Sequence, residues 1–189
     1  MYASQLLRLA KQDHFMRKTL VGVFPGNKIP DISSRCVNQG LIVNSADSED
    51  MGEHWLLIFV KPADKMVIYF DSLGRPPGYY NETIDEWINS WGFNVVLNKK
   101  AVQASHSHYC GLFVLFVLYF LCRNASYESI LKKFSANPAR NDSLVSRFAW
   151  YRFRFNAKTE LQSTATVKDL YKQMKYDLLL LASKNKNYI

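Results

Sequence analysis

This 189-residue sequence has no hydrophobic run of membrane-spanning length and no even number of cysteines. The longest apolar stretch, residues 110–122, is interrupted only by Gly111 and is too short for a transmembrane helix, which needs about 20 residues. Residues 1–10 carry Gln5 and Arg8 and no small-residue cleavage site, so we expect no secretory signal. Three cysteines make an odd number, which argues against a disulfide framework. We therefore expect an intracellular, non-secreted protein that makes no use of a membrane.

Acidic residues are scarce in the second half of the chain. Residues 1–100 hold eleven Lys or Arg and eleven Asp or Glu, whereas residues 101–189 hold thirteen against five. The whole net charge of +8 therefore lies after residue 100. Such asymmetry favours a polyanionic partner, with general solubility as the simpler interpretation.

Hydrophobic content of 48% is enough for a core, and nothing in the pattern divides the chain. We expect one domain over residues 1–189, with a basic, helical C-terminal region at about 126–189. Hydrophobic patterns predict helices at 3–13, 82–91, 111–121, 127–134 and 166–183, and strands at 55–60, 65–70 and 93–97. Residues 36–43 are predicted to be either a strand or a short buried segment. Residues 22–31 are predicted to be a loop. The fold class is α+β, a mixed sheet packed on a buried helix that begins at Cys110.

A predicted hairpin brings a histidine and a carboxylate together. If residues 61–64 form its loop, Val60 pairs with Lys65 and His54 lies opposite Asp71. A carboxylate there would fix the imidazole tautomer and leave the other ring nitrogen free as a base. A surface hydrogen bond is the simpler interpretation of this pair alone.

Cys110 stands directly before the predicted buried helix. A helix N-terminus lowers a thiol pKa, which favours the nucleophilic thiolate. Gln103, seven residues upstream, can donate its side-chain amide to an oxyanion beside Cys110. A cysteine in this position is by itself more often a small buried hydrophobe. Together with His54 and Asp71, however, these residues complete the set needed for acyl transfer by cysteine.

These residues resemble those of adenain-like cysteine proteases, the adenovirus endopeptidase family, in the clan of the SUMO-specific proteases. Three strings carry the resemblance: Gly-Glu-His-Trp at 52–55, Phe-Asp-Ser-Leu-Gly at 70–74, and Gln103 followed by Cys-Gly-Leu-Phe at 110–113. The resemblance implies a papain-like architecture with adenain-type topology. It extends to about residue 141 and is compatible with a DNA virus or a self-synthesising DNA transposon as the source.

The resemblance implies that His54 is the general base, Asp71 orients it, Cys110 attacks and Gln103 lines the oxyanion hole. Trp55 would lie by the substrate channel, with a core role as the alternative. Adenain-type enzymes usually have Glu where this chain has Asp71. The substrates implied are capsid or virion precursors cleaved at Gly-containing sites, within a virion or the host nucleus or cytoplasm.

The resemblance also bears on cofactors and partners. Adenain is activated by DNA and by a disulfide-linked peptide, but residues 93–97, where that disulfide would form, contain no cysteine. The missing cysteine argues against activation by a disulfide-linked peptide, whereas activation by DNA is compatible with the sequence. We also expect no metal and a monomer. A metal site at His106, His108 and Cys110 would lack ligands. Cys36 and Cys122 are predicted to be buried thiols.

Residues 147–155 alternate basic and aromatic side chains. We interpret them as a half-buried strand with a basic face, or as a groove that binds nucleic acid. The candidate DNA contacts are Lys132, Lys133, Arg147, Arg152 and Arg154. Two alternatives to the viral endopeptidase stay open: a protease that deconjugates SUMO or ubiquitin-like proteins, and a catalytically silent DNA-binding module.

Overall fold

A five-stranded mixed sheet is the centre of the fold. The computed structural model describes residues 1–32, 36–47 and 54–161. The strands lie in sequence order across the sheet: β1 (Leu20–Pro25), β2 (Gln39–Asn44), β3 (Trp55–Lys61), β4 (Met66–Phe70) and β5 (Asn94–Leu97). The two outer pairs are parallel and the two inner pairs antiparallel. The predicted α+β class with a mixed sheet is confirmed.

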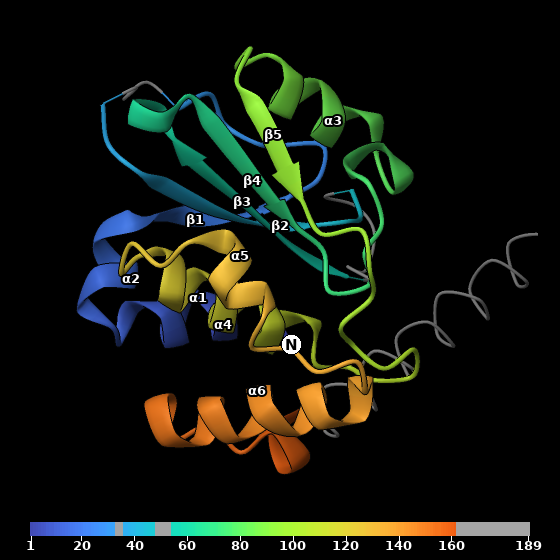
Figure 1. Cartoon of the computed structure of the whole chain (residues 1–189). Coiled ribbons are helices and arrows are strands. Elements are labelled where there is room, and N and C mark those ends of the chain that lie inside the picture. The colour runs from blue at the N-terminus through green and yellow to red at the C-terminus, as the bar shows by residue number, and fades with distance from the viewer. Residues whose placement is uncertain (33–35, 48–53, 162–189) are drawn as a thin grey trace, which may run out of the picture.

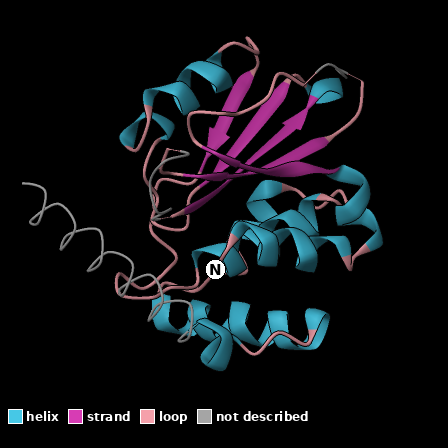
Figure 2. Cartoon of the chain, turned by 180° about the vertical axis from the view of Figure 1, so that it is seen from behind, coloured by secondary structure: helices cyan, strands magenta, loops and turns pink. Residues whose placement is uncertain are grey.

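Helices cover both faces of this sheet (Figure 1). Six α-helices are described: α1 (Ala3–Lys11), α2 (His14–Thr19), α3 (Glu82–Asn89), α4 (Cys110–Leu121), α5 (Tyr127–Leu131) and α6 (Pro138–Phe153). Short 3₁₀ turns occupy Pro62–Asp64 and Pro77–Tyr79. Helix α3 lies on one face, while α1, α2, α4 and α5 lie on the other, with α6 as a further layer beyond α4 (Figures 1 and 2).

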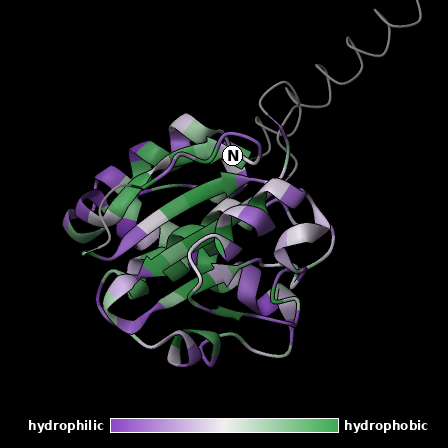
Figure 3. Ribbon diagram, turned by 90° about the horizontal axis from the view of Figure 1, so that it is seen from above, coloured by the Kyte–Doolittle hydropathy of each residue, from purple (hydrophilic) through white to green (hydrophobic). Residues whose placement is uncertain are grey.

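Strand β3 is buried on both faces, as its continuous apolar sequence predicts. Its alternate residues enter two separate cores. Leu57 and Phe59 pack with α4, whereas Leu56 and Ile58 pack with α3. Figure 3 shows the hydrophobic residues gathered in the strands and in the helices that pack on them.

Helix α4 is apolar all round and buried along most of its length, between the sheet and α6. Cys110 is its first residue, so the nucleophile predicted from sequence begins the central helix. None of the described helices combines the length and the apolar composition that a bilayer-spanning segment requires.

The predicted strand at residues 147–155 is wrong, because most of this segment belongs to α6. Asn137 caps the helix by accepting a hydrogen bond from Ala139 N, and Pro138 occupies its first turn. Val145, Ala149 and Phe153 are buried at a spacing of four residues, which is a helical period. The alternating aromatic and basic residues therefore do not form two strand faces.

Residues 22–31 were predicted as a loop, and this prediction is wrong for residues 22–25, which belong to β1, but right for residues 26–31, which lie outside the helices and strands. The pairing of β1 with β2 is irregular between Leu20 and Gly22, and Pro25 ends the strand. An edge strand tolerates Gly22 and Pro25 because one side of its backbone needs no hydrogen-bond partner in the sheet. The predicted C-terminal helix at 166–183 lies outside the described residues, while α5 and α6 make residues 126–153 of the basic region largely helical.

Candidate active site

Asp71 follows the last residue of β4, and its buried carboxylate accepts four hydrogen bonds. His54 Nε2 donates to Oδ1 at 2.5 Å, and the backbone N–H of Leu73 donates to the same oxygen at 2.8 Å. The Arg75 N–H and the Tyr80 hydroxyl donate to Oδ2 at 2.8 and 3.1 Å. This shell holds the carboxylate in one orientation towards His54.

The predicted contact between His54 and Asp71 is present, but the register that predicted it is wrong. Val60 pairs with Val67 instead of Lys65, a difference of two residues. Lys65 adopts a left-handed conformation (φ 46°) after the 3₁₀ turn, so Lys61 still belongs to the ladder and pairs with Met66. A shift of two keeps every side chain on its predicted face.

His54 and Asp71 lie beyond the paired ends of β3 and β4, and backbone contacts fix their positions. The His54 carbonyl accepts a hydrogen bond from Ser45 N at 2.9 Å, which ties it to the chain leaving β2. Asn98 follows β5; its Nδ2 donates to the Asp71 carbonyl at 2.5 Å, and its Oδ1 accepts from Asp71 N at 3.2 Å. The Tyr127 hydroxyl donates to the same Asn98 oxygen.

Gly74 permits the turn that carries Asp71. Its φ is +72°, and its N–H donates to the Asp71 carbonyl at 2.9 Å. A Cβ at this position would lie 2.6 Å from the Lys100 carbonyl carbon. Glycine is therefore required both by the backbone conformation and by the close approach of the chain that follows β5.

The His54 ring bridges Asp71 and Cys110. Since Nε2 donates to Asp71, the other ring nitrogen is the one available to Cys110, with which His54 is also hydrogen-bonded. Burial by itself would lower the pKa of His54, but the hydrogen bonds and negative charges of Asp71 and Cys110 raise it to about 9. The imidazolium is therefore favoured at neutral pH.

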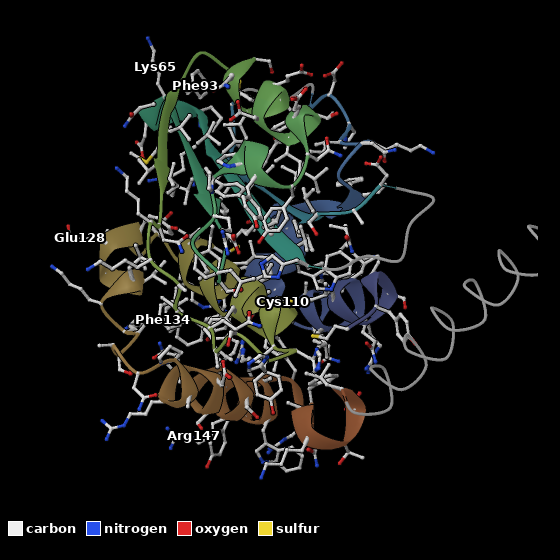
Figure 4. The ribbon with its side chains drawn as sticks, turned by 90° about the vertical axis from the view of Figure 1, so that its right-hand side faces the viewer. Lys65, Phe93, Cys110, Glu128, Phe134 and Arg147 are labelled. Carbon is white, nitrogen blue, oxygen red and sulfur yellow. The ribbon has the colours of Figure 1, made fainter. Side chains whose placement is uncertain are left out.

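Cys110 is buried, with 8% of its surface exposed, and Tyr109 is the N-cap residue of its helix. Burial raises the pKa of the thiol, but this effect is outweighed by the hydrogen bond with His54, the charge of His54 and a hydrogen bond with the Trp55 backbone. The pKa of Cys110 is consequently below its ordinary value. The two pKa shifts favour a thiolate–imidazolium pair between Cys110 and His54. Figure 4 labels Cys110 at the start of α4.

Gln103 lies in the loop that leads into α4, and its side chain is held at both ends. Its Oε1 accepts a hydrogen bond from the Ser72 hydroxyl at 2.6 Å, and its Nε2 donates to the Ser107 carbonyl at 2.7 Å. An amide nitrogen has two hydrogens, so one remains for an oxyanion. Only 4% of this residue is exposed.

Trp55 packs in the core at the start of α4. Its indole N–H donates to the Met1 carbonyl at 3.0 Å, and 5% of the residue is exposed. A Cβ at Gly111 would lie 3.4 Å from the Trp55 ring and 2.9 Å from the Met1 sulfur, so glycine permits this packing. The burial agrees with the core alternative for Trp55, and its contact with substrate stays a prediction.

Tyr80 belongs to the site and was not predicted from the sequence. Its ring lies 5.5 Å from the His54 ring, tilted by 31°, and its hydroxyl donates to Asp71. Burial, and then the charge of Asp71, raise the pKa of Tyr80, so the hydroxyl keeps its proton. The loop sequence around Gly78 gave no periodic signal that would have placed this ring over His54.

Ser72, Asn98 and Asn141 were also missed, although each is buried and polar. A buried polar side chain must have partners, but a sequence does not say which isolated Ser or Asn is buried.

The five basic residues predicted to contact DNA differ in their surroundings. Lys132 pairs with Glu128 at 2.7 Å, and the Lys133 ammonium lies over the Phe120 ring. Arg152 forms an internal ion pair with the buried carboxylate of Asp13, so much of its charge is already compensated. Arg147 lies within α6, and Arg154 is the C-cap residue of this helix. Figure 4 shows Arg147 at the lower edge of the molecule.

A cavity of about 550 Å³ lies between α4 and α6, away from Cys110. Aromatic side chains of both helices line it, including Phe116, Phe148 and Tyr151, together with Arg147 and Arg152.

The cysteines other than Cys110 differ from each other. Cys36 is exposed, which corrects the prediction of a buried thiol, because the chain leaves the core before β2 begins. Cys122 is partly buried, and burial raises its pKa to about 11. Within the described ranges, no group of three or more His, Cys, Asp or Glu residues could hold a metal ion.

Comparison with known proteins identifies the kind of site. Residues 47–144 match the model of the Ulp1 protease family, C-terminal catalytic domain, and this range contains His54, Asp71, Gln103 and Cys110. The protease of ovine adenovirus D serotype 7 is 27% identical over an alignment of 127 positions, and the match covers 61% of this chain and 62% of that protein. The match therefore spans less than two thirds of the relative.

Solved structures that match this chain include three proteases or effector proteins. The ASFV pS273R protease superposes with a TM-score of 0.42 and 24% identity, over 58% of this chain and 43% of that one. The Chlamydia trachomatis effector protein ChlaDUB1 gives 0.49 and 13%, over 78% and 69%. The SUMO protease Ulp1, with its catalytic cysteine oxidised to a sulfinic acid, gives 0.34 and 15%, over 57% and 52%.

Proposed function

Since this chain belongs to the Ulp1 protease family, we propose that it is a cysteine endopeptidase with Cys110 as nucleophile and His54 as acid–base. The observation that carries the proposal is the His54 ring, which is hydrogen-bonded to the Asp71 carboxylate on one side and to Cys110 on the other. A nucleophile, its base and the group that orients the base are thus in contact.

Acylation begins when the Cys110 thiolate attacks the carbonyl carbon of the scissile peptide bond. The carbonyl electron pair moves to oxygen, and a tetrahedral intermediate forms. His54, protonated at the nitrogen facing Cys110, then gives its proton to the leaving amine as the carbon–nitrogen bond breaks. The products of this step are a thioester on Cys110, a free amine and neutral His54.

Deacylation uses the same residues in the reverse roles. Neutral His54 takes a proton from a water molecule, whose oxygen attacks the thioester carbon. Collapse of the second tetrahedral intermediate expels the Cys110 thiolate and leaves a carboxylic acid, while His54 remains protonated. The thiolate–imidazolium pair is restored, and Asp71 holds the imidazole throughout.

The oxyanion formed in each step needs hydrogen-bond donors. The uncommitted N–H of the Gln103 side chain and the backbone N–H of Cys110 supply them in this proposal, and the N-terminus of α4 adds a favourable dipole.

The proposed substrates are capsid or virion precursors with Gly-containing cleavage sites, encoded by a DNA virus or a related element. The similarity to an adenovirus protease supports this choice. Removal of SUMO or ubiquitin-like proteins is the second candidate, supported by the family to which residues 47–144 belong. Trp55 stays a candidate for the wall of the substrate channel.

One experiment tests the activity and separates the two substrate classes. Purified protein and its Cys110→Ala variant are incubated with a Gly-containing peptide library and with probes that carry ubiquitin or SUMO C-termini. We expect internal peptide cleavage by the wild type and none by the variant. Reaction with the probes alone would favour the deconjugating protease, and equal activity of the variant would overturn the cysteine mechanism.

We also propose that the basic half binds DNA without sequence preference. The excess of positive charge after residue 100 and the exposed Lys132 support this proposal. Phosphate neutralisation with release of counterions is the physical basis. Such binding would retain the enzyme near packaged DNA, inside the particle or the host cell.

A further inference from the structure

The orientation of the Gln103 side chain is decided by its neighbours. A glutamine amide is nearly symmetric in shape, so rotating it by 180° exchanges an acceptor for a donor at little steric cost. The Ser107 carbonyl can only accept, and it faces Nε2 at 2.7 Å. The Ser72 hydroxyl donates to Oε1 at 2.6 Å. The Ser107 contact therefore requires the orientation that points the N–H groups away from Ser72, and the Ser72 hydroxyl, which can donate or accept, donates to Oε1 in that orientation.

Ser72 also holds the backbone that carries Gln103. Its carbonyl accepts hydrogen bonds from the N–H groups of Val102 and Gln103, at 2.8 and 3.0 Å. Ser72 is completely buried and directly follows Asp71. One residue therefore links the acid of the triad to the proposed oxyanion donor through three hydrogen bonds.

Helix α6 fixes the same segment from the other side. Asn141, of which 1% is exposed, donates from Nδ2 to the carbonyls of Val102 and Ser135, both at 2.9 Å. Its Oδ1 accepts from Ser135 N at 2.7 Å. The residue before Gln103 is consequently bonded on its N–H side to Ser72 and on its carbonyl side to α6.

We propose that Ser72 is a positioning residue: it holds the Gln103 side chain so that the Gln103 amide N–H faces the oxyanion. In the same proposal, Asn141 supports the Gln103 backbone from α6. The inference rests on the proposed peptidase function. Without the Ser72 hydroxyl, buried Oε1 has no donor, and the amide is free to rotate or to leave the oxyanion hole. Transition-state stabilisation is then reduced, while Cys110 and His54 are unaffected.

The test compares Ser72→Ala, Gln103→Ala and the double variant in peptide hydrolysis. We expect Gln103→Ala to reduce kcat about 100-fold, as loss of an oxyanion donor does. Ser72→Ala should reduce kcat about tenfold and leave KM nearly unchanged. This loss is smaller than that of Gln103→Ala because the Gln103 amide is still present. In the Gln103→Ala background, removal of the Ser72 hydroxyl should have no further effect.

A second readout separates positioning from general damage. Alkylation of Cys110 by iodoacetamide forms no oxyanion, so its rate should be the same in Ser72→Ala and the wild type. Ser126→Ala is the matched control: it removes a hydroxyl that caps α5, away from Gln103, and should leave kcat unchanged. Asn141→Asp, which loses the donors to Val102 and Ser135, should lower kcat and likewise spare alkylation.

Each result decides the inference. Unchanged kcat in Ser72→Ala, independent losses in the double variant, or slower alkylation of Cys110 would each overturn the positioning role. A wild type that hydrolyses no peptide and no ubiquitin-like probe would overturn the proposed function itself, and the role of Ser72 with it. A fully active wild type with an equally active Ser72→Ala variant would overturn the positioning role alone.

Discussion

His54 Nε2 lies 2.5 Å from Asp71 Oδ1, although the two residues are 17 positions apart in the chain and neither is paired with a residue of the neighbouring strand in the β3–β4 ladder. Each lies just outside a strand, His54 before β3 and Asp71 after β4. The hairpin brings them near each other, and hydrogen bonds from Asn98, Leu73 and Arg75 set the final geometry.

Replacement of this carboxylate tests its effect on His54. Asp71→Asn removes the negative charge and favours the wrong imidazole tautomer, so we expect a large loss in kcat with a small change in KM. The pKa of His54, now about 9, should fall. Because activity requires protonated His54, the alkaline limb of the kcat/KM profile should move from near pH 9 to lower pH. Asp85→Asn, on α3 and away from His54, serves as the control. An unchanged alkaline limb in Asp71→Asn would contradict the coupling.

Thiol reactivity should distinguish Cys110 from Cys122. The lowered pKa of Cys110 provides thiolate at neutral pH, whereas a pKa of about 11 leaves Cys122 almost fully protonated. We expect iodoacetamide to modify Cys110 first at pH 7, and His54→Ala to slow that reaction. The experiment uses a Cys36→Ser background, because Cys36 is exposed. Mass mapping after brief labelling gives the order, and faster modification of Cys122 would refute the ion pair.

The Tyr80 hydroxyl should contribute to catalysis through Asp71. Tyr80→Phe keeps the ring over His54 and removes one of the two donors to Asp71 Oδ2. We expect kcat to fall by roughly tenfold, the lower end for a lost hydrogen bond to a charged group, because the Arg75 N–H still donates to the same oxygen. Tyr79→Phe, its exposed neighbour, is the control and should keep full activity. Equal kcat values for the two variants would show that this hydrogen bond is dispensable.

Asp13 should stabilise the fold by joining α2 to α6 and to Arg123, which directly follows α4. Its buried carboxylate caps α2 and forms ion pairs with Arg123 and Arg152. Burial would raise the pKa of Asp13, but these partners lower it to about 2. Asp13→Asn should therefore reduce the free energy of unfolding at pH 7 by about 2 kcal/mol.

The pH dependence gives the sign of this effect. A carboxylate whose folded pKa is lowered stabilises the fold above its unfolded pKa, and loses that effect as pH falls through the folded value. The wild type and Asp13→Asn should thus converge between about pH 4 and pH 2 in urea titrations. Asp64→Asn removes an exposed ion pair with Lys61 and should cost less than about 0.5 kcal/mol. A pH-independent difference would contradict the ion-pair explanation.

DNA binding should depend on exposed cations and on salt. Fluorescence anisotropy with a labelled duplex should show affinity falling with salt, with a log–log slope of about 0.9 per phosphate contacted. A triple variant with Lys132→Gln, Lys133→Gln and Arg147→Gln should bind DNA more weakly, and its affinity should depend less steeply on salt. Arg152 is left intact because it pairs with Asp13, and Lys65→Gln, at the far end of the hairpin, is the control. Binding that is absent at low salt, or unaffected by salt, would refute the proposal.

Local patterns in the sequence were sufficient to predict most of the elements that build the site. The hairpin of β3 and β4, the all-apolar helix after Cys110 and the amphipathic α3 follow from periodicity and turn residues. The predictions were wrong where one local sequence pattern is compatible with two kinds of secondary structure. Alternation in residues 147–155 is compatible with a strand, yet the segment is mainly helical, since its four-residue apolar spacing packs on α4.

The sequence by itself determined which groups we propose to react: a cysteine at a helix start, a histidine and an aspartate at the hairpin ends, and a glutamine before the helix. These depend on neighbours close in the chain, so periodicity and spacing carry them. Only the tertiary structure decided how the groups are held. Three contacts hold them, each between residues 26 to 31 positions apart in the chain: Ser72 with Gln103, Asn98 with Asp71, and Tyr80 with His54. Such contacts depend on which polar side chains the packed core encloses, and packing is a property of the whole chain.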